Sequence, residues 1–179
     1  VESPFYEILF AEKDLSPELK RIADDLRENG FAVFDFPDPE LFARIDRIVA
    51  SLEPTFDFAG WRKSGWQTGQ SLRVQDAWNT HPDVRAIAGN ARILEILSLL
   101  YGRQAFPFQT LNFPVGTQQS LHTDSVHFSS VPERFMSGVW VALEDIGEDN
   151  GPLEYYPGSH KLPDYVNEHI NACDSMQAA

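Results

Sequence analysis

The sequence has very little cysteine and few basic residues. A single cysteine, Cys173, stands among 179 residues, so no disulfide can form within the chain, which fits a reducing cytoplasm. Lys and Arg number 14 against 27 Asp and Glu, and the formal net charge is −13. Duplex nucleic acid and anionic lipid both attract basic surfaces, so we expect neither partner. The negative total says little about small-molecule substrates, because a local patch can oppose it.

Long apolar runs are missing too. No stretch approaches the roughly 20 apolar residues that span a bilayer, and the start, "VESPFYEILF", lacks the features of a signal peptide. We therefore expect a cytoplasmic protein without a membrane partner. Hydrophobic residues make up 42% of the chain, which is typical of one globular domain over residues 1–179. The oligomeric state cannot be read from the sequence.

Residues 1–103 follow a mainly helical pattern. Residues 16–30 have Ser16 as an N-cap, Pro17 in the first turn and Gly30 as the stop, with an apolar stripe of Leu19, Ile22, Ala23 and Leu26. Further helices are predicted at residues 38–52, 81–90 and 91–102. The inward face of the helix at 38–52 is predicted to be Leu41, Ile45, Ile48, Val49 and Leu52. Residues 31–36 are predicted as a short strand, and residues 54–70 as an irregular, exposed loop.

After Gly102 the pattern favours strands. Short aromatic or β-branched segments are separated by turn residues, at 104–116, 118–128, 135–146 and 152–160. The "GEDNG" segment at 147–151 has an Asn-Gly core and is predicted to join two strands as a hairpin. Helices followed by strands predict an α+β fold, in which the N-terminal helices pack on one side of an antiparallel jelly roll or related double sheet.

One segment of the strand region pairs two metal-binding side chains. "QQSLHTDSVHF" contains His122 and Asp124, which would share one face of a strand about 6–7 Å apart along the backbone. One imidazole and one carboxylate are two-thirds of the facial triad that binds non-haem Fe(II). The His-x-Asp pattern alone is weak, because such triplets are often surface ion pairs.

Three ordered blocks give this pair a context: "LHTDSVHF", "GVWVALEDI" and "NGPLEYYPGSHK". Together they resemble the phytanoyl-CoA dioxygenase family of Fe(II)- and 2-oxoglutarate-dependent oxygenases. "LRVQDAW" and "FQTLNF" extend the resemblance upstream. The resemblance implies a double-stranded β-helix (a cupin-like jelly roll), Fe(II) and 2-oxoglutarate as cofactors, and dioxygen and a small molecule as substrates.

The resemblance also implies roles for single residues. His122 and Asp124 match two iron ligands, and the Asp favours hydroxylation, since related halogenases carry Ala or Gly there. Trp140 matches an aromatic residue that lines the 2-oxoglutarate pocket, with simple core packing as the alternative. Small Gly138 and Ala142, on the same face of the predicted strand, would leave room for a ligand there.

Three upstream residues match positions around the co-substrate. Arg73 matches a basic position, and a guanidinium suits a carboxylate, although a surface arginine is the alternative. Leu111 matches an apolar residue of the pocket. Gln109 lies two positions away on the same face and could reach a carboxylate or the substrate.

Other aromatic and imidazole side chains have weaker assignments. His127 is either a substrate contact or an exposed or structural histidine. His160, in "PGSH", resembles a family feature that closes a turn rather than a ligand. Trp61 and Trp66 either form a lid over the site or only pack.

Two parts of the family pattern are missing. The family's second histidine ligand lies on a later strand, and an arginine after it binds 2-oxoglutarate. Here Arg134 is the last arginine, and His169 is the only histidine after "PGSH", in a segment that does not look like a strand. Either the C-terminal strands are missing from this chain, or the protein has lost the site. We favour an incomplete chain, because a jelly roll without these strands would expose open edges.

Three functions therefore remain open. The first is an Fe(II)- and 2-oxoglutarate-dependent dioxygenase that hydroxylates an unactivated C–H bond of a small organic substrate. The second is a non-catalytic β-helix binding domain that has lost the complete metal site. The third is a cupin-like metalloprotein that does not use 2-oxoglutarate.

Overall fold

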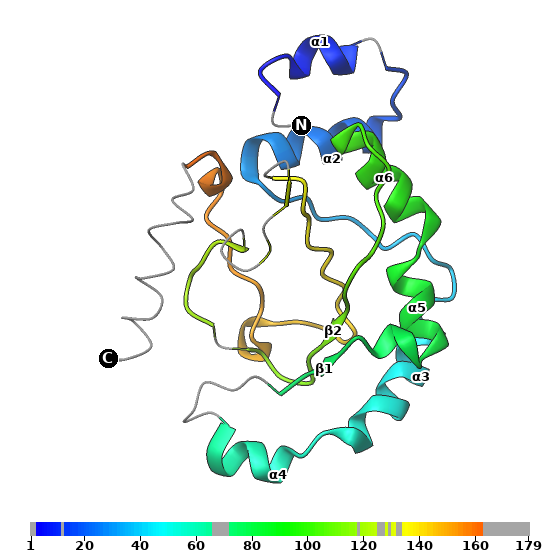
Figure 1. The fold of residues 1–179 in the computed structure, drawn as a ribbon, viewed down its shortest axis with the longest axis vertical. Coiled ribbons are helices and arrows are strands. Elements are labelled where there is room, and N and C mark those ends of the chain that lie inside the picture. The colour runs from blue at the N-terminus through cyan, green and yellow to red at the C-terminus, as the bar shows by residue number, and fades with distance from the viewer. Residues whose placement is uncertain are drawn as a thin grey trace. The chain divides into compact units, whose positions relative to one another are not determined.

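The computed structural model describes residues 3–11, 13–65, 72–117, 119–124, 128, 130–131 and 134–162. Its α-helices are α1 (Tyr6–Ala11), α2 (Pro17–Asn29), α3 (Leu41–Leu52), α4 (Phe58–Gly60), α5 (Pro82–Ala88) and α6 (Ala91–Tyr101) (Figure 1). Single turns of other helix types are η1 (Glu53–Thr55), η2 (Trp61–Gly65), η3 (Ala77–Asn79), η5 (Glu148–Asn150) and η6 (Ser159–Lys161). The strands are β1 (Val74–Gln75) and β2 (Leu111–Asn112). Within the described ranges, every helix is too short or too polar to cross a membrane.

The chain divides into two compact units. The first comprises Val1–Ala32, Gln119–Trp140 and Tyr155–Ala179, and the second comprises Val33–Gln118 and Val141–Glu154. The prediction of one domain over residues 1–179 stays a prediction.

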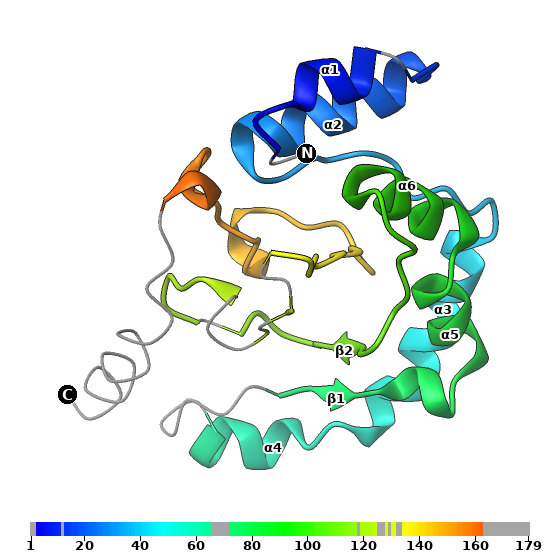
Figure 2. The same cartoon turned by 45° about the horizontal axis from the view of Figure 1, so that its top comes forward.

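In the second unit, α3 and α5 pack around a small apolar core. Ile48, Ala77 and Val84 are its buried centre, with partly buried Leu52, Val74, Trp78, Ile87 and Leu143 around it. β1 pairs with β2 in an antiparallel ladder in which Val74 faces Asn112 and Gln75 faces Leu111. Figures 1 and 2 both show these strands side by side. The core therefore holds β1 and η3 against α3 and α5.

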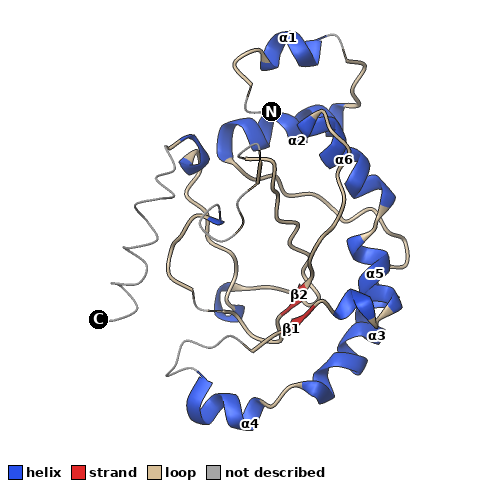
Figure 3. Cartoon of the chain, in the orientation of Figure 1, coloured by secondary structure: helices blue, strands red, loops and turns tan. Residues whose placement is uncertain are grey.

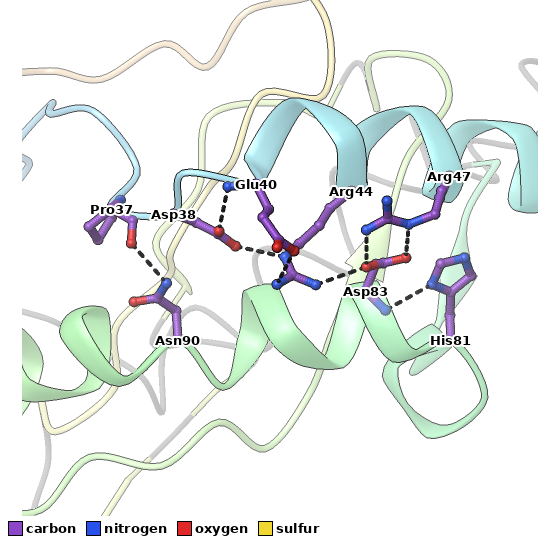
Figure 4. Close-up of polar contacts among 8 residues, drawn as sticks. All are labelled: Pro37, Asp38, Glu40, Arg44, Arg47, His81, Asp83 and Asn90. Carbon is purple, nitrogen blue, oxygen red and sulfur yellow. Dashed lines mark hydrogen bonds and ion pairs between the residues drawn. The ribbon is translucent and has the colours of Figure 1, made fainter.

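A buried carboxylate joins the same two helices. Asp83, in the first turn of α5, is 6% exposed and accepts hydrogen bonds from Arg47 Nε at 2.8 Å and from Arg44 Nη1 at 2.9 Å (Figure 4). Arg44 also donates to Asp38 at 2.8 Å. The hydrogen bonds from Arg47 and then Arg44 hold the pKa of Asp83 far below its usual value, against the opposing effect of burial. The His81 ring caps the start of α5 by accepting the Asp83 N–H at 3.2 Å.

In the first unit, α2 has the ends that the sequence predicts. Ser16 Oγ accepts the Leu19 N–H at 3.3 Å, and Gly30 ends the helix in the left-handed region at φ 87°. Ile22 and Ala23, from the predicted apolar stripe, are fully buried. Tyr6 of α1 is 1% exposed, and its hydroxyl donates to Asp24 of α2 at 2.7 Å. Burial first, and then this hydrogen bond, raise the pKa of Tyr6 above its usual value.

The strand predictions are confirmed only at Leu111–Asn112. The described parts of residues 31–36, 118–128, 135–146 and 152–160 contain no strand. Figure 3 draws 31–36 and 135–146 as loop, and the helical turn η6 at the end of 152–160 as helix. A turn is present at 147–151, but it is the helical turn η5 with no strand on either side, so the predicted hairpin is wrong. The Gly147 N–H donates to Asn150 Oδ1 at 3.1 Å, and Gly151 is left-handed at φ 72°. A strand needs a hydrogen-bonded neighbour, and apolar sequence alone does not supply one. Of the strands that the predicted jelly roll requires, the described residues contain only β1 and β2, which form one short ladder.

Two further local predictions are wrong. Residues 53–65 form the helical turns η1, α4 and η2 rather than an irregular loop, and Asp57 caps α4 by accepting the Gly60 N–H at 2.8 Å. Val49, predicted to face inward on α3, is 41% exposed, because the core contacts the Ile48 side of the helix. Residues 66–70 of the predicted loop lie outside the described residues.

Candidate metal centre

His122 and Asp124 lie side by side, although not on a strand. His122 Nε2 is 3.4 Å from Asp124 Oδ1, and His122 Nδ1 is 2.7 Å from the Ser120 carbonyl oxygen. The side chains are 30% and 58% exposed, so small ligands in solvent can reach both. The two side chains approach each other as predicted, although neither residue lies in a strand.

The hydrogen bond to Ser120 defines the chemistry of the imidazole. A carbonyl oxygen only accepts, so Nδ1 carries the proton and donates it. In a neutral ring the Nε2 lone pair then points toward a carboxylate oxygen, and two electron-rich atoms at this distance repel each other unless a cation or a proton lies between them. Metal-bound histidines commonly donate their other ring N–H to a backbone carbonyl in this way. The pair could therefore supply two ligands to a divalent metal ion, and an ion pair with a protonated imidazole is the alternative.

The two residues do not make a complete metal site by themselves. Within the described ranges, no group of three His, Cys, Asp or Glu side chains could hold a metal ion. His81 caps α5, and His160 Nε2 contacts the Arg27 carbonyl oxygen at 3.1 Å. The turn that His160 was expected to close is η6, so this expectation agrees with the structure. His127 and His169 lie outside the described residues.

Leu111 lies in the β1–β2 ladder, and Arg73 and Gln109 lie just outside it. Gln75 faces Leu111 across the ladder, so the two side chains share one face of it. Neither Arg73 nor Gln109 is part of a strand, so the ladder does not fix the face of either side chain. Arg73 is exposed, whereas Gln109 and Leu111 are partly buried. The roles of Arg73, Gln109 and Leu111 around the co-substrate stay predictions.

Trp140 lies in the first unit and is 52% exposed, so it is not packed into a core. A Cβ built on Gly138, two residues earlier, would meet no atom within 4 Å. The role of Trp140 in lining a co-substrate pocket stays a prediction. Trp61 is partly buried in η2, its role as a lid stays a prediction, and Trp66 lies outside the described residues.

Sequence reasoning missed two polar groups near these residues. Asn112, next to Leu111, has a buried Oδ1 with no hydrogen-bond partner among the described residues. Burial, and then the charge of Asp124, raise the pKa of the Tyr155 phenol. No pattern links Tyr155 to Asp124 in the sequence. The β-branched and aromatic neighbours of Asn112 indicated a strand, but not which of its polar groups would be buried.

The sequence pattern of one known protein family, phytanoyl-CoA dioxygenase (PhyH), matches residues 26–179. No curated protein and no solved structure matches the chain significantly. The match includes both residues of the candidate metal centre, the β1–β2 ladder and Trp140.

Proposed function

The chain belongs to the phytanoyl-CoA dioxygenase family, and on this premise we propose that it is an Fe(II)- and 2-oxoglutarate-dependent dioxygenase. The reaction we assign is hydroxylation of an unactivated C–H bond in a small organic substrate, with dioxygen as the oxidant. One observation carries the proposal: the Nε2 of His122 faces Asp124 at 3.4 Å while Nδ1 is held by a backbone carbonyl. The single cysteine fits a reducing compartment such as the cytoplasm.

His122 and Asp124 would supply two of the iron ligands. The Ser120 carbonyl holds the imidazole in the tautomer that binds metal, and the Asp124 carboxylate adds a negative charge to the site. When bound, Fe(II) and 2-oxoglutarate supply the oxidising power: the keto acid is converted to succinate and CO₂, and one oxygen atom of O₂ enters the substrate. Two protein ligands leave coordination positions for a further histidine, which the family pattern places on a later strand, and for the co-substrate.

We assign the co-substrate contacts to Arg73, Gln109, Leu111 and Trp140, as the family resemblance implies. Arg73 would pair with a carboxylate of 2-oxoglutarate through its planar guanidinium. Gln109 would donate its amide N–H to the same class of ligand, and Leu111 would provide apolar contact. Trp140, half exposed beside the open space at Gly138, would give the co-substrate a flat apolar surface.

An anaerobic titration tests the metal site directly. The protein, expressed from its complete gene, is titrated with Fe(II) and then with 2-oxoglutarate, and the visible absorption band of the iron–keto acid complex is recorded. Asp124→Ala should weaken Fe(II) binding at least roughly tenfold, because a charged ligand is lost. Asp145→Ala is the matched control, since Asp145 is also exposed and its removal changes the net charge equally.

Turnover is measured as succinate formed from 2-oxoglutarate. Fe-dependent succinate formation that Asp124→Ala abolishes and Asp145→Ala preserves is the expected result. Metal binding without any effect of 2-oxoglutarate would instead identify a metalloprotein of another kind. Absence of both the band and metal binding would identify a non-catalytic domain.

A further inference from the structure

The chain contains two Asn-Gly pairs, Asn29–Gly30 and Asn150–Gly151, and a carboxylate residue precedes each of them. In an Asn-Gly pair, the glycine nitrogen can attack the side-chain amide of the asparagine. Glycine favours this ring closure because it has no side chain to obstruct it and its backbone turns freely. The structure places the two pairs in different surroundings, so they form a matched comparison within one molecule.

Hydrogen bonds hold the first pair at the end of a helix. Asn29 is the last residue of α2, and the Gly30 N–H donates to the Leu26 carbonyl oxygen at 3.1 Å. The Asn29 carbonyl oxygen accepts the Gly158 N–H at 2.9 Å. The Gly30 nitrogen can reach the Asn29 side chain only after this helix end opens. Attack at Asn29 therefore requires local unfolding first.

The second pair lies in the turn at residues 147–151, where both of its residues are exposed. Asn150 is the last residue of η5, and its N–H donates to the Gly147 carbonyl oxygen at 3.2 Å. Among the described residues, the Gly151 N–H has no hydrogen-bond acceptor. The nitrogen that would attack is therefore not held by a hydrogen bond of the kind that holds Gly30.

The Asn150 side chain is also prepared for attack. Its Oδ1 accepts the Gly147 N–H at 3.1 Å. Attack at Cγ places negative charge on Oδ1, and a backbone N–H already aimed at that oxygen stabilises the charge. The carboxylates of Glu148 and Asp149 oppose the reaction by repulsion, but they act through solvent and are screened by salt. Glu28 exerts the same kind of repulsion on Asn29, so this effect is shared by the two pairs.

We propose that Asn150 is a site of spontaneous deamidation and that the fold protects Asn29. The Gly151 nitrogen bonds to Asn150 Cγ and loses its proton, and the side-chain nitrogen leaves as ammonia, which closes a succinimide ring. Water then opens the ring and leaves either aspartate or isoaspartate at position 150. The reaction needs no iron, so its outcome is independent of the proposed oxygenase activity.

Isoaspartate would disturb a close backbone crossing in the second unit. A Cβ built on Gly151 would lie 3.1 Å from Gly116 Cα, and a Cβ built on Gly116 would lie 3.1 Å from Gly151 Cα. Isoaspartate adds a methylene group to the main chain directly before Gly151. Because the crossing has no room for additional atoms, the turn must shift away from Gly116. The product also adds a further carboxylate to an acidic turn.

Peptide mapping by mass spectrometry tests the proposal on the full chain, aged in native buffer and in guanidinium chloride. Trypsin releases residues 28–44 and 135–161, and each peptide contains a single asparagine. In native buffer, Asn150 should convert at least roughly tenfold faster than Asn29, because two hydrogen bonds protect the first pair. In guanidinium chloride, the rate at Asn29 should rise to that at Asn150. Asn150→Gln is the control and should abolish conversion in the peptide 135–161, because glutamine closes the larger ring slowly.

Thermal unfolding tests the effect on the crossing. Asn150→Asp carries the new charge without the additional main-chain atom, so protein enriched in isoaspartate should have a lower Tm than this variant. Equal conversion of Asn29 and Asn150 in native buffer would overturn the proposal. A preference for Asn150 that persists in guanidinium chloride would also overturn it, because sequence rather than structure would then set the rates. Equal Tm values for the isoaspartate form and Asn150→Asp would refute the assigned effect at Gly116.

Discussion

Gly30 offers a quantitative test of how α2 is joined to the segment that contains His160. A Cβ placed on Gly30 would lie 2.6 Å from Nδ1, 2.9 Å from Cγ and 3.2 Å from Cβ of His160. The contact reaches the base of the imidazole and not only its tip, so rotation of the ring cannot relieve it. Gly30→Ala must therefore displace the ring and its hydrogen bond to Arg27 O.

The expected cost has two parts. A left-handed conformation costs a non-glycine residue about 1–2 kcal/mol, and Gly30 has φ 87°. Loss of the His160–Arg27 hydrogen bond adds about 0.5–1.5 kcal/mol. The sum, about 1.5–3.5 kcal/mol, corresponds to a fall in Tm of roughly 3–14 °C for a chain of this size.

Gly102 provides the matched control. It ends α6 in the same left-handed region, at φ 64°, but a Cβ there would meet nothing within 4 Å. Gly102→Ala should therefore show only the backbone cost of about 1–2 kcal/mol. The effect of alanine on the unfolded chain is common to both variants and cancels in the comparison.

Thermal unfolding followed by circular dichroism measures both variants. In a His160→Ala background, the cost of Gly30→Ala should fall to that of Gly102→Ala, with a coupling of about 1 kcal/mol. Equal costs for the two glycines in the wild-type background, or no rescue by His160→Ala, would refute the reasoning.

The remaining predictions concern the second unit. Ile48→Ala should lower the free energy of unfolding by about 2–5 kcal/mol in urea titrations, since Ile48 is 2% exposed. Val49→Ala should cost less than about 1 kcal/mol, because the Val49 side chain is 41% exposed. Similar losses for the two variants would contradict the assigned core. The pKa of Asp83 is lowered by Arg47 and Arg44, so its contribution to stability is present above the unfolded value of about 3.9 and is lost as the pH falls through and below it. Asp83→Asn should therefore lower the free energy of unfolding near neutral pH. Below about pH 5, the urea midpoint of the variant should change less with pH than that of the wild type. An unchanged pH dependence would show that the arginines do not stabilise the carboxylate as described.

Local sequence signals were sufficient where a helix is stabilised by its own residues. The Ser16 cap, the apolar stripe and Gly30 predicted α2 closely, and Gly102 marked the end of α6. The prediction of an irregular loop at residues 54–70 gave too much weight to Gly and Ser and too little to Asp57, which caps α4.

The strand predictions depended on information that local sequence does not contain. Residues 135–142 have the composition of a strand, but a ladder forms only where a second segment supplies complementary N–H and C=O groups. Leu111–Asn112 has that partner in Val74–Gln75, which is far away in the chain. The register of this ladder, in which Gln75 faces Leu111, is a consequence of that pairing.

By itself the sequence determined the family, the main helices and the closeness of His122 to Asp124, because each depends on residues near one another in the chain. Only the tertiary structure decided which atoms meet across long separations. Sequence identified Gly30 as a helix stop, but not that His160, 133 positions after Arg27, would dock against that helix end. Asp83 likewise looked like an ordinary first-turn aspartate until packing of α5 on α3 buried it between two arginines. Such contacts depend on how separate helices and turns pack, and the energy of that packing is not encoded in any one segment.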